Sequence, residues 1–122
     1  MKIIVCGGRH NRLSDKDRLW LDALHATHGI TEVIHGGARG INCDADEWAR
    51  QRKIPITIFE ALWSRDGASA GAKRNRVMLQ YLLSRQPSQT RMVIAFPGGK
   101  GTADMVAKAH CAHVPVLLAR ES

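Results

Sequence analysis

The sequence predicts one three-layer α/β/α domain over residues 1–122, built around a mainly parallel sheet of about five strands. Short apolar runs alternate with stretches in which apolar residues recur at helical spacing, and this order is typical of βαβ units. The apolar runs lack polar alternation, as expected of parallel strands that are buried on both faces. The chain length suits a single hydrophobic core.

The predicted strands are short apolar or β-branched runs bounded by glycine or proline. Gly7 and Gly8 end the first strand, and Pro55 opens the third. The glycine-bearing stretch over residues 60–70 is expected to be a loop. The strands are predicted at residues 2–6, 33–35, 56–59, 91–96 and 115–119.

The predicted helices each follow a strand and carry one apolar face. Ser14 is the expected N-cap of the first helix, with Asp17 three residues later as in a capping box, and Gly29 is the stop signal. The later helices are predicted at residues 42–52, 73–84 and 102–112. The expected apolar faces comprise Leu13, Leu19, Trp20, Ala23 and Leu24, then Ala45, Trp48 and Ala49, then Val77, Met78, Tyr81 and Leu82.

The formal net charge of +7 favours anionic partners, whether small phosphates, nucleic acid or acidic surfaces. The positive charges are dispersed, apart from Lys73, Arg74 and Arg76, so most of them are expected to solvate the surface. An aromatic content of 5% argues against a platform that stacks single-stranded nucleic acid. We therefore expect a small anionic ligand rather than nucleic acid.

No apolar stretch is long enough to span a bilayer, and the first apolar run ends at Gly7, too soon for a signal peptide. We therefore expect a cytoplasmic protein without a membrane partner. The cysteines Cys6, Cys43 and Cys111 form an odd set without paired spacing, so reduced thiols are expected.

Two histidine pairs lie near predicted helix C-termini, where the helix dipole favours histidine. They form no complete four-ligand set, so we expect neither a bound metal nor another cofactor. The pairs are His25 with His28, and His110 with His113 beside Cys111.

Three glycine-rich turns follow predicted strands, at residues 7–9, 36–40 and 98–102. A glycine turn that leads into a helix exposes backbone N–H groups at the positive end of the helix dipole, which is a ready site for an anion. A single turn of this kind often reflects only the torsion angles that glycine allows. Because the strands are predicted to be parallel, all three turns are expected at the edge of the sheet where ligands bind.

The last turn departs from two common phosphate-binding patterns. Gly101 separates Lys100 from Thr102, whereas the phosphate loop of nucleoside triphosphatases needs Lys followed directly by Ser or Thr. Asp104 stands where the dinucleotide-binding pattern requires its third glycine. The turns therefore indicate a phosphorylated ligand without assigning the chain to either class.

Single residues near these turns support the same hypothesis. Arg74 can bind a phosphate in bidentate fashion, with a surface salt bridge as the alternative. Arg9 and Arg39 lie within glycine turns, so ligand contact is expected. Trp63 is expected either to stack on a base or to plug an edge of the core. Asp104, in the first turn of the last predicted helix, either complements the helix dipole or takes part in catalysis.

The segment Pro97-Gly98-Gly99-Lys100-Gly101-Thr102 resembles the PGGxGT motif of the SLOG superfamily, which includes the LOG cytokinin-activating phosphoribohydrolases. The chain as a whole is more similar to the YspA-like (DUF2493) branch of that superfamily. The matching motifs, in chain order, are Gly7-Gly8-Arg9, then His35-Gly36-Gly37-Ala38-Arg39-Gly40, then Ala45, Trp48 and Ala49, and finally Trp63, Gly67, Ala70, Gly71, Arg74, Asn75 and Met78.

This resemblance implies a Rossmann-like domain that binds a nucleotide or a nucleotide derivative, and relatives also imply a homo-oligomer. In LOG enzymes, an arginine before the fourth strand and a glutamate after PGGxGT serve cleavage of an N-glycosidic bond to ribose phosphate. Arg74 matches the arginine, whereas Asp104 replaces the glutamate and Met105 replaces the acidic residue after it. The YspA-like branch usually carries Asp where this chain has Asn42, with Asp44 nearby, at a position suited to a ribose hydroxyl.

These observations support three candidate functions. The first is a sensor or sequestering module that binds a nucleotide or nucleotide-derived ligand, such as an NAD- or ADP-ribose-like molecule or a nucleoside phosphate. The second is an N-glycoside (phosphoribosyl) hydrolase with Arg74 and Asp104 as catalytic residues, so the sequence leaves the presence of catalysis open. The third is a nucleic-acid-binding module, as in the related DNA-processing fold. The expected ligand-binding residues are Gly8, Arg9, Gly36, Gly37, Ala38, Arg39, Gly40, Asn42, Trp63, Arg74, Asn75, Pro97, Gly98, Gly99, Lys100, Gly101 and Thr102.

Overall fold

The computed structural model describes residues 1–84 and 90–119, and it confirms the predicted α/β fold. The five strands of its sheet are all parallel and lie in the order β3-β2-β1-β4-β5. The chain adds β2 and β3 on one side of β1, then β4 and β5 on the other, so the topological switch point lies between β1 and β4. The strands are β1 (Lys2–Cys6), β2 (Glu32–His35), β3 (Ile56–Ile58), β4 (Arg91–Ala95) and β5 (Val116–Leu118).

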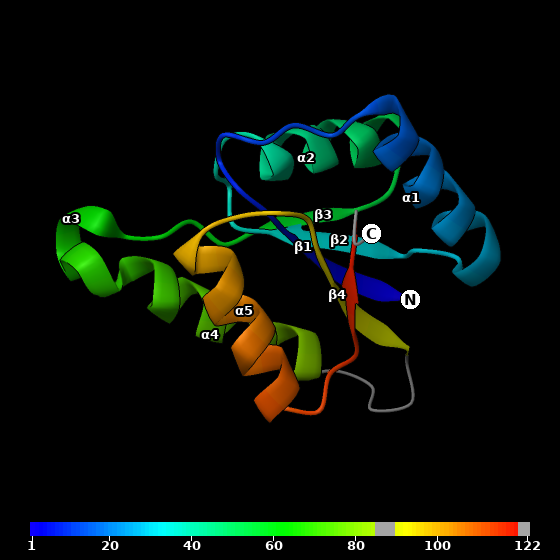
Figure 1. Cartoon of the computed structure of the whole chain (residues 1–122). Helices are drawn as coiled ribbons and strands as arrows, with labels where there is room; N and C mark the ends of the chain where they lie inside the picture. Colours follow the sequence, from blue (N-terminus) through cyan, green and yellow to red (C-terminus); the bar gives the residue numbers. More distant parts are fainter. Residues whose placement is uncertain (85–89, 120–122) are drawn as a thin grey trace.

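Helices cover both faces of the sheet (Figure 1). One face carries α1 (Asp15–His28) and α2 (Ile41–Gln51), and the other carries α4 (Ala70–Leu83) and α5 (Lys100–Cys111). Successive strand residues point to opposite faces. Ile3 therefore packs in the core cluster that contains Trp48 of α2, whereas Ile4 packs in the cluster that contains Met105 of α5.

The first helix begins and ends at the predicted signals. Ser14 Oγ accepts from the Asp17 N–H at 3.1 Å, and the Asp17 carboxylate accepts from the Ser14 N–H at 2.8 Å. Gly29 follows the helix with a φ of 68°, in the left-handed region that glycine tolerates. The prediction of Leu19 and Ala23 on the apolar face is wrong, because Leu21 points into the core. Leu19, two residues away, is 67% exposed, and Ala23 is exposed as well.

The prediction of a loop over residues 60–70 is wrong in part. The short helix α3 (Trp63–Asp66) and the 3-10 turn η1 (Gly67–Ser69) occupy this stretch, and α4 begins at Ala70. Local hydrogen bonds explain these turns, since the Asp66 carboxylate accepts from Lys73 Nζ at 3.2 Å and the Asp66 carbonyl accepts from Ser69 Oγ at 2.8 Å. Such contacts leave no trace in the spacing of apolar residues.

Val77 of α4 is a further misplaced apolar residue. It is 46% exposed, because Met78, Leu79 and Leu82 form the inner face of α4. Cys6, Cys43 and Cys111 are free thiols. Among the residues that the structure describes, no helix combines the length and the apolar character needed to cross a membrane.

The edge of the sheet where the strands begin carries a polar cluster around Glu32. Its carboxylate accepts from Thr57 Oγ1 at 2.5 Å and from the Tyr81 hydroxyl at 2.6 Å, and it lies 3.4 Å from Lys2 Nζ. Burial by itself raises the pKa of Glu32, but the three donors outweigh burial and leave this pKa below its ordinary value.

We expect this cluster to make stability depend on pH. A lowered pKa in the folded state stabilises the protein above the unfolded pKa, near 4.5, and this contribution is lost as pH falls. The free energy of urea unfolding should therefore fall between roughly pH 5 and pH 3 more steeply in the parent than in Glu32→Gln. The exposed Glu47→Gln is the control. Equal acid slopes in the parent and Glu32→Gln would contradict this role.

Candidate functional site

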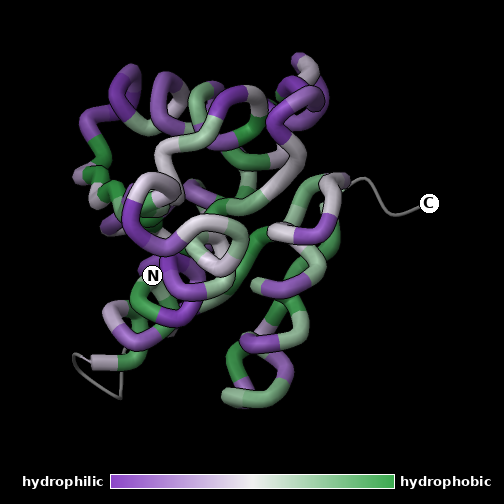
Figure 2. The backbone as a smooth tube through the Cα atoms, turned by 90° about the vertical axis from the view of Figure 1, so that its left-hand side faces the viewer, coloured by the Kyte–Doolittle hydropathy of each residue, from purple (hydrophilic) through white to green (hydrophobic). Residues whose placement is uncertain are grey.

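The turns after β1, β2 and β4 meet where the strands end, as predicted. They line a pocket of about 540 Å³ next to the topological switch point. Figure 2 turns this side of the molecule toward the viewer, and many of the loops there are coloured white to purple, as hydrophilic or neutral residues. The predicted residues that line this first pocket are Gly8, Arg9, Gly36, Ala38, Asn42, Arg74, Asn75, Pro97, Gly98, Gly99, Lys100, Gly101 and Thr102.

A second pocket of about 670 Å³ adjoins the first and extends toward α3. The predicted residues Gly37, Arg39 and Trp63 line it, together with Glu60 and Ala61. Trp63 is 53% exposed, so it does not plug an edge of the core. The two pockets share the wall made by Arg9, His10, Gly36, Ala38 and Arg74.

The N-terminus of α5 faces the first pocket without a capping side chain. The helix begins at Lys100, two residues before its predicted start, and Gly99 at the N-cap has no side chain to offer. The Ala103 N–H is the first to bond back into the helix, to the Gly99 carbonyl at 3.0 Å. The N–H groups of Lys100, Gly101 and Thr102 therefore remain for solvent or an anion. In contrast, α1 lines neither pocket and has a complete capping box.

Close backbone packing explains why two of the turns need glycine. The Gly8 N–H donates to the Pro97 carbonyl at 2.9 Å, so the turns after β1 and β4 touch. A Cβ on Gly98 would clash with the Thr102 side chain and lie 2.7 Å from the Gly8 nitrogen. Gly99 differs, because a Cβ there would meet no atom within 4 Å.

Gly40 was expected among the ligand-binding residues but lines neither pocket. Its φ is 72°, and a Cβ would lie 2.6 Å from the carbonyl oxygens of Gly8, Arg9 and Asn11. Gly40 therefore allows α2 to begin directly against the turn after β1, and it shapes the pocket without lining it.

His35, buried at the end of β2, holds the turn that follows it. Its Nδ1 accepts from the Gly37 N–H at 3.0 Å, and its Nε2 lies 2.7 Å from Asp46 Oδ2 on α2. Because Nδ1 acts as the acceptor, Nε2 carries the proton and donates it to Asp46. The histidine of the His-Gly-Gly segment thus fixes the backbone of the turn.

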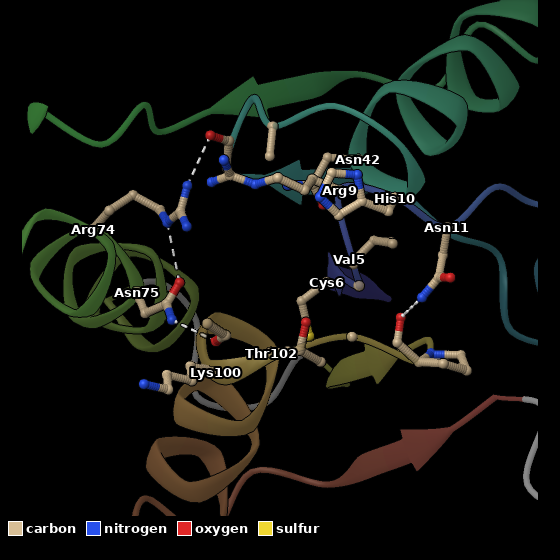
Figure 3. A pocket seen from close by; sticks show the side chains of 18 of the residues that line it. Val5, Cys6, Arg9, His10, Asn11, Asn42, Arg74, Asn75, Lys100 and Thr102 are labelled. Atoms are coloured by element: carbon tan, nitrogen blue, oxygen red, sulfur yellow. Dashed lines mark hydrogen bonds between the residues drawn. The ribbon is translucent and has the colours of Figure 1, made fainter. Parts of the chain in front are cut away.

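Arg74 lies between the two pockets, and it forms no salt bridge with a carboxylate of the described residues. Its Nη1 donates to the Gly36 carbonyl at 2.9 Å, and its Nε donates to Asn75 Oδ1 at 3.1 Å. Burial lowers the pKa of Arg74, and the nearby charge of Arg9 lowers it further. Figure 3 shows the Arg9 side chain reaching toward Arg74. An anion between these like charges would relieve their repulsion.

Asn75 joins α4 to the start of α5. It is 2% exposed, and its Nδ2 donates to the Gly101 carbonyl and to Asp104 Oδ2, both at 3.0 Å. Because Asn75 also accepts from Arg74, it positions both the guanidinium and the helix N-terminus.

Asp104 lines neither pocket and lies in the second turn of α5, not in the first as predicted. Its Oδ1 accepts from Lys108 Nζ at 2.5 Å, and its Oδ2 accepts from Asn75. Burial by itself raises the pKa of Asp104, but the hydrogen bonds from Lys108 and Asn75 outweigh burial and lower it. Both carboxylate oxygens are therefore engaged within the protein.

Asn42 lines the first pocket and is 6% exposed, and its Oδ1 has no hydrogen-bond partner among the described residues. A buried acceptor without a donor costs free energy, which a hydroxyl or N–H of a ligand would recover. The neighbouring Asp44 is not available to contact a ligand in place of Asn42. Its carboxylate accepts from Arg12 at 2.8 Å and from the Leu13 N–H at 2.9 Å, so it ties the loop before α1 to α2.

The lining residues that were not predicted include Cys6, His10, Asn11 and Glu60. Burial raises the pKa of Cys6 to about 12, which keeps this thiol neutral near pH 7. His10 and Asn11 directly follow the predicted Gly8-Arg9 turn, and Glu60 follows β3. The available signal was therefore their position at or just after the end of a strand, because parallel strands all end at the same edge.

Two comparisons place the chain among known proteins. The sequence model of the YAcAr family (YspA, cpYpsA-related SLOG family) matches residues 1–65, which include the turns after β1 and β2. The chain is also similar to the Gene 61 protein of Mycobacterium phage D29, with 31% identity over 126 residues that cover 95% of this chain and 94% of that protein. The family match spans more than half of the chain and agrees with the parallel sheet and its glycine turns. This chain therefore belongs to the YspA, cpYpsA-related SLOG family.

Proposed function

We propose that this protein binds a phosphorylated nucleoside or a related nucleotide derivative, of the NAD, ADP-ribose or nucleoside phosphate type, and acts as a sensor or sequestering module. Membership of a SLOG family suggests a nucleotide-related ligand-binding or nucleoside-processing role. One observation carries the finer proposal. The uncapped N-terminus of α5 and the guanidinium groups of Arg9 and Arg74, which have no carboxylate partner among the described residues, line the same pocket.

In this proposal, the N-terminus of α5, Arg74 and Asn42 each have a defined role in the first pocket. The phosphate accepts hydrogen bonds from the free N–H groups at the start of α5 and is neutralised by Arg74, whose guanidinium is already held in place by Gly36 and Asn75. A ribose hydroxyl donates to Asn42 Oδ1 and so satisfies the buried acceptor.

A thermal-shift experiment tests the proposal. Nucleoside monophosphates, nucleoside diphosphates, NAD and ADP-ribose are compared with inorganic phosphate and with unphosphorylated nucleosides. At least one phosphorylated nucleoside should raise the melting temperature by mass action, and it should do so more than phosphate or its own nucleoside does at equal concentration. A panel without any shift would contradict the proposal.

Hydrolysis of an N-glycosidic bond is the second candidate function, because Asn75 links Arg74 to Asp104. A carboxylate near the anomeric carbon would stabilise the positive charge that develops there. Asp104 is one methylene shorter than the glutamate of LOG enzymes, and both of its oxygens bind other side chains. We therefore expect binding with slow or no turnover.

Chromatography of free base released from nucleoside monophosphates and ADP-ribose measures this turnover. The parent, Asp104→Asn and Asp104→Glu are compared. Release by Asp104→Glu alone would mean that the pocket suits hydrolysis but lacks a carboxylate of sufficient reach. Rapid release by the parent that Asp104→Asn abolishes would make the protein an enzyme and overturn the sensor proposal.

A further inference from the structure

The second pocket contains a large aromatic surface next to the charged wall. Trp63 is 53% exposed there, whereas Trp48 is 1% exposed in the core. The far edge of the Trp63 ring lies over Gly71 of α4. A Cβ added to Gly71 would lie 3.5 Å from Trp63 Cη2. The ring is therefore placed against α4 while much of its surface remains accessible to a flat ligand.

Glu60 is the one carboxylate among the described residues that line the two pockets. It forms no salt bridge with a described residue, although Arg39 and Arg74 line the same pocket. Its side chain lies over the turn after β2, since a Cβ on Gly37 would be 3.1 Å from Glu60 Cγ. The pocket thus presents the carboxylate of Glu60, which only accepts hydrogen bonds when it is ionised. Glu60 stands three residues before Trp63 in the chain.

We propose that the second pocket is the base subsite and that it takes guanine, stacked on Trp63 and recognised by Glu60. This inference rests on the proposed function. The two pockets share Arg9 and Arg74, so one nucleotide can place its phosphate in the first pocket and its base in the second. Stacking on an aromatic ring favours any base, so Trp63 supplies affinity without selectivity.

Glu60 supplies the selectivity. Guanine carries two adjacent donors, N1–H and the 2-amino group, and the two oxygens of one carboxylate can accept from both. Hypoxanthine lacks the amino group and leaves one oxygen without a donor. Adenine turns the lone pair of its N1 toward the carboxylate, which is repulsive and acts against binding.

Calorimetric titration with the 5′-monophosphates of guanosine, inosine and adenosine tests this subsite. The parent should bind guanosine monophosphate about tenfold more tightly than inosine monophosphate, the effect of one hydrogen bond to a charged group. Its preference over adenosine monophosphate should be larger, because adenine offers neither donor and adds repulsion. Glu60→Gln should lose this preference and favour adenosine monophosphate, because an amide can pair in bidentate fashion with adenine. If Glu60→Gln weakens all three ligands equally, Glu60 contacts a part that they share, such as the ribose, and the inference fails.

The stacking step has a matched pair of variants. Trp63→Ala should weaken all three monophosphates roughly tenfold, because a base–aromatic stack is lost for each of them. Leu62→Ala removes a similarly exposed side chain that lines neither pocket, and it should bind like the parent. Parental binding by Trp63→Ala would overturn the subsite. If nucleotides bind but these variants change nothing, the base subsite fails and the proposed function stands. If no nucleotide binds the parent, both fail.

Discussion

The Gly99→Val protein should fold like the parent and lose its binding of phosphorylated nucleosides. Gly99 lines the first pocket, and a Cβ there would meet no atom of the protein within 4 Å. A valine side chain would therefore occupy the space that a phosphate needs in order to reach the N–H groups of α5. The measurement is the ligand-induced rise in melting temperature, with circular dichroism as the check on folding.

Two neighbouring variants control this result. Ala103→Val places the same side chain on the exposed surface of α5, outside both pockets, and should keep the full shift. Gly98→Ala should lower the stability of the free protein, because its Cβ would meet the Thr102 side chain and the Gly8 nitrogen. A parental shift in Gly99→Val would show that the phosphate lies elsewhere.

Arg74→Lys should weaken nucleotide binding by about 1–3 kcal/mol, the contribution of a hydrogen bond to a charged group, although the charge is kept. The guanidinium uses Nη1 on the Gly36 carbonyl and Nε on Asn75, and its planar fork leaves further N–H donors for the ligand. An ammonium group cannot hold both anchors and offer a bidentate contact at once. Affinity is measured by calorimetric titration.

The control for this prediction lies on the same helix. Arg76 is exposed and lines neither pocket, so Arg76→Lys should leave the dissociation constant unchanged. If Arg74→Lys and Arg76→Lys bind equally well, Arg74 has no special contact with the ligand.

The fold was predictable from the sequence because its signals are local. Apolar runs without polar alternation indicate buried parallel strands, and the order of strands and helices then fixes where the glycine turns lie. The capping pattern of Ser14 and Asp17 was equally local, and the structure confirms it. Leu19 was misplaced because the choice of inner face depends on what packs against the helix, which spacing alone does not reveal.

The parts of the site that sequence reasoning missed depend on contacts between distant segments. Glu60 gave no periodic signal, and only the structure shows that it lines the same pocket as Arg39 and Arg74. The separation of Asp104 from the pocket follows from its contacts with Asn75 and Lys108. The role of Gly40 in packing against three carbonyl oxygens likewise required the structure.

Native mass spectrometry of freshly purified protein, alone and with added nucleoside phosphates, NAD and ADP-ribose, tests directly whether the protein binds a phosphorylated nucleoside. We expect a chain that carries the added mass of one phosphorylated nucleoside, and we expect that Gly99→Val carries none. A parent protein that shows only the mass of its own chain in the presence of every one of these ligands would contradict nucleotide binding.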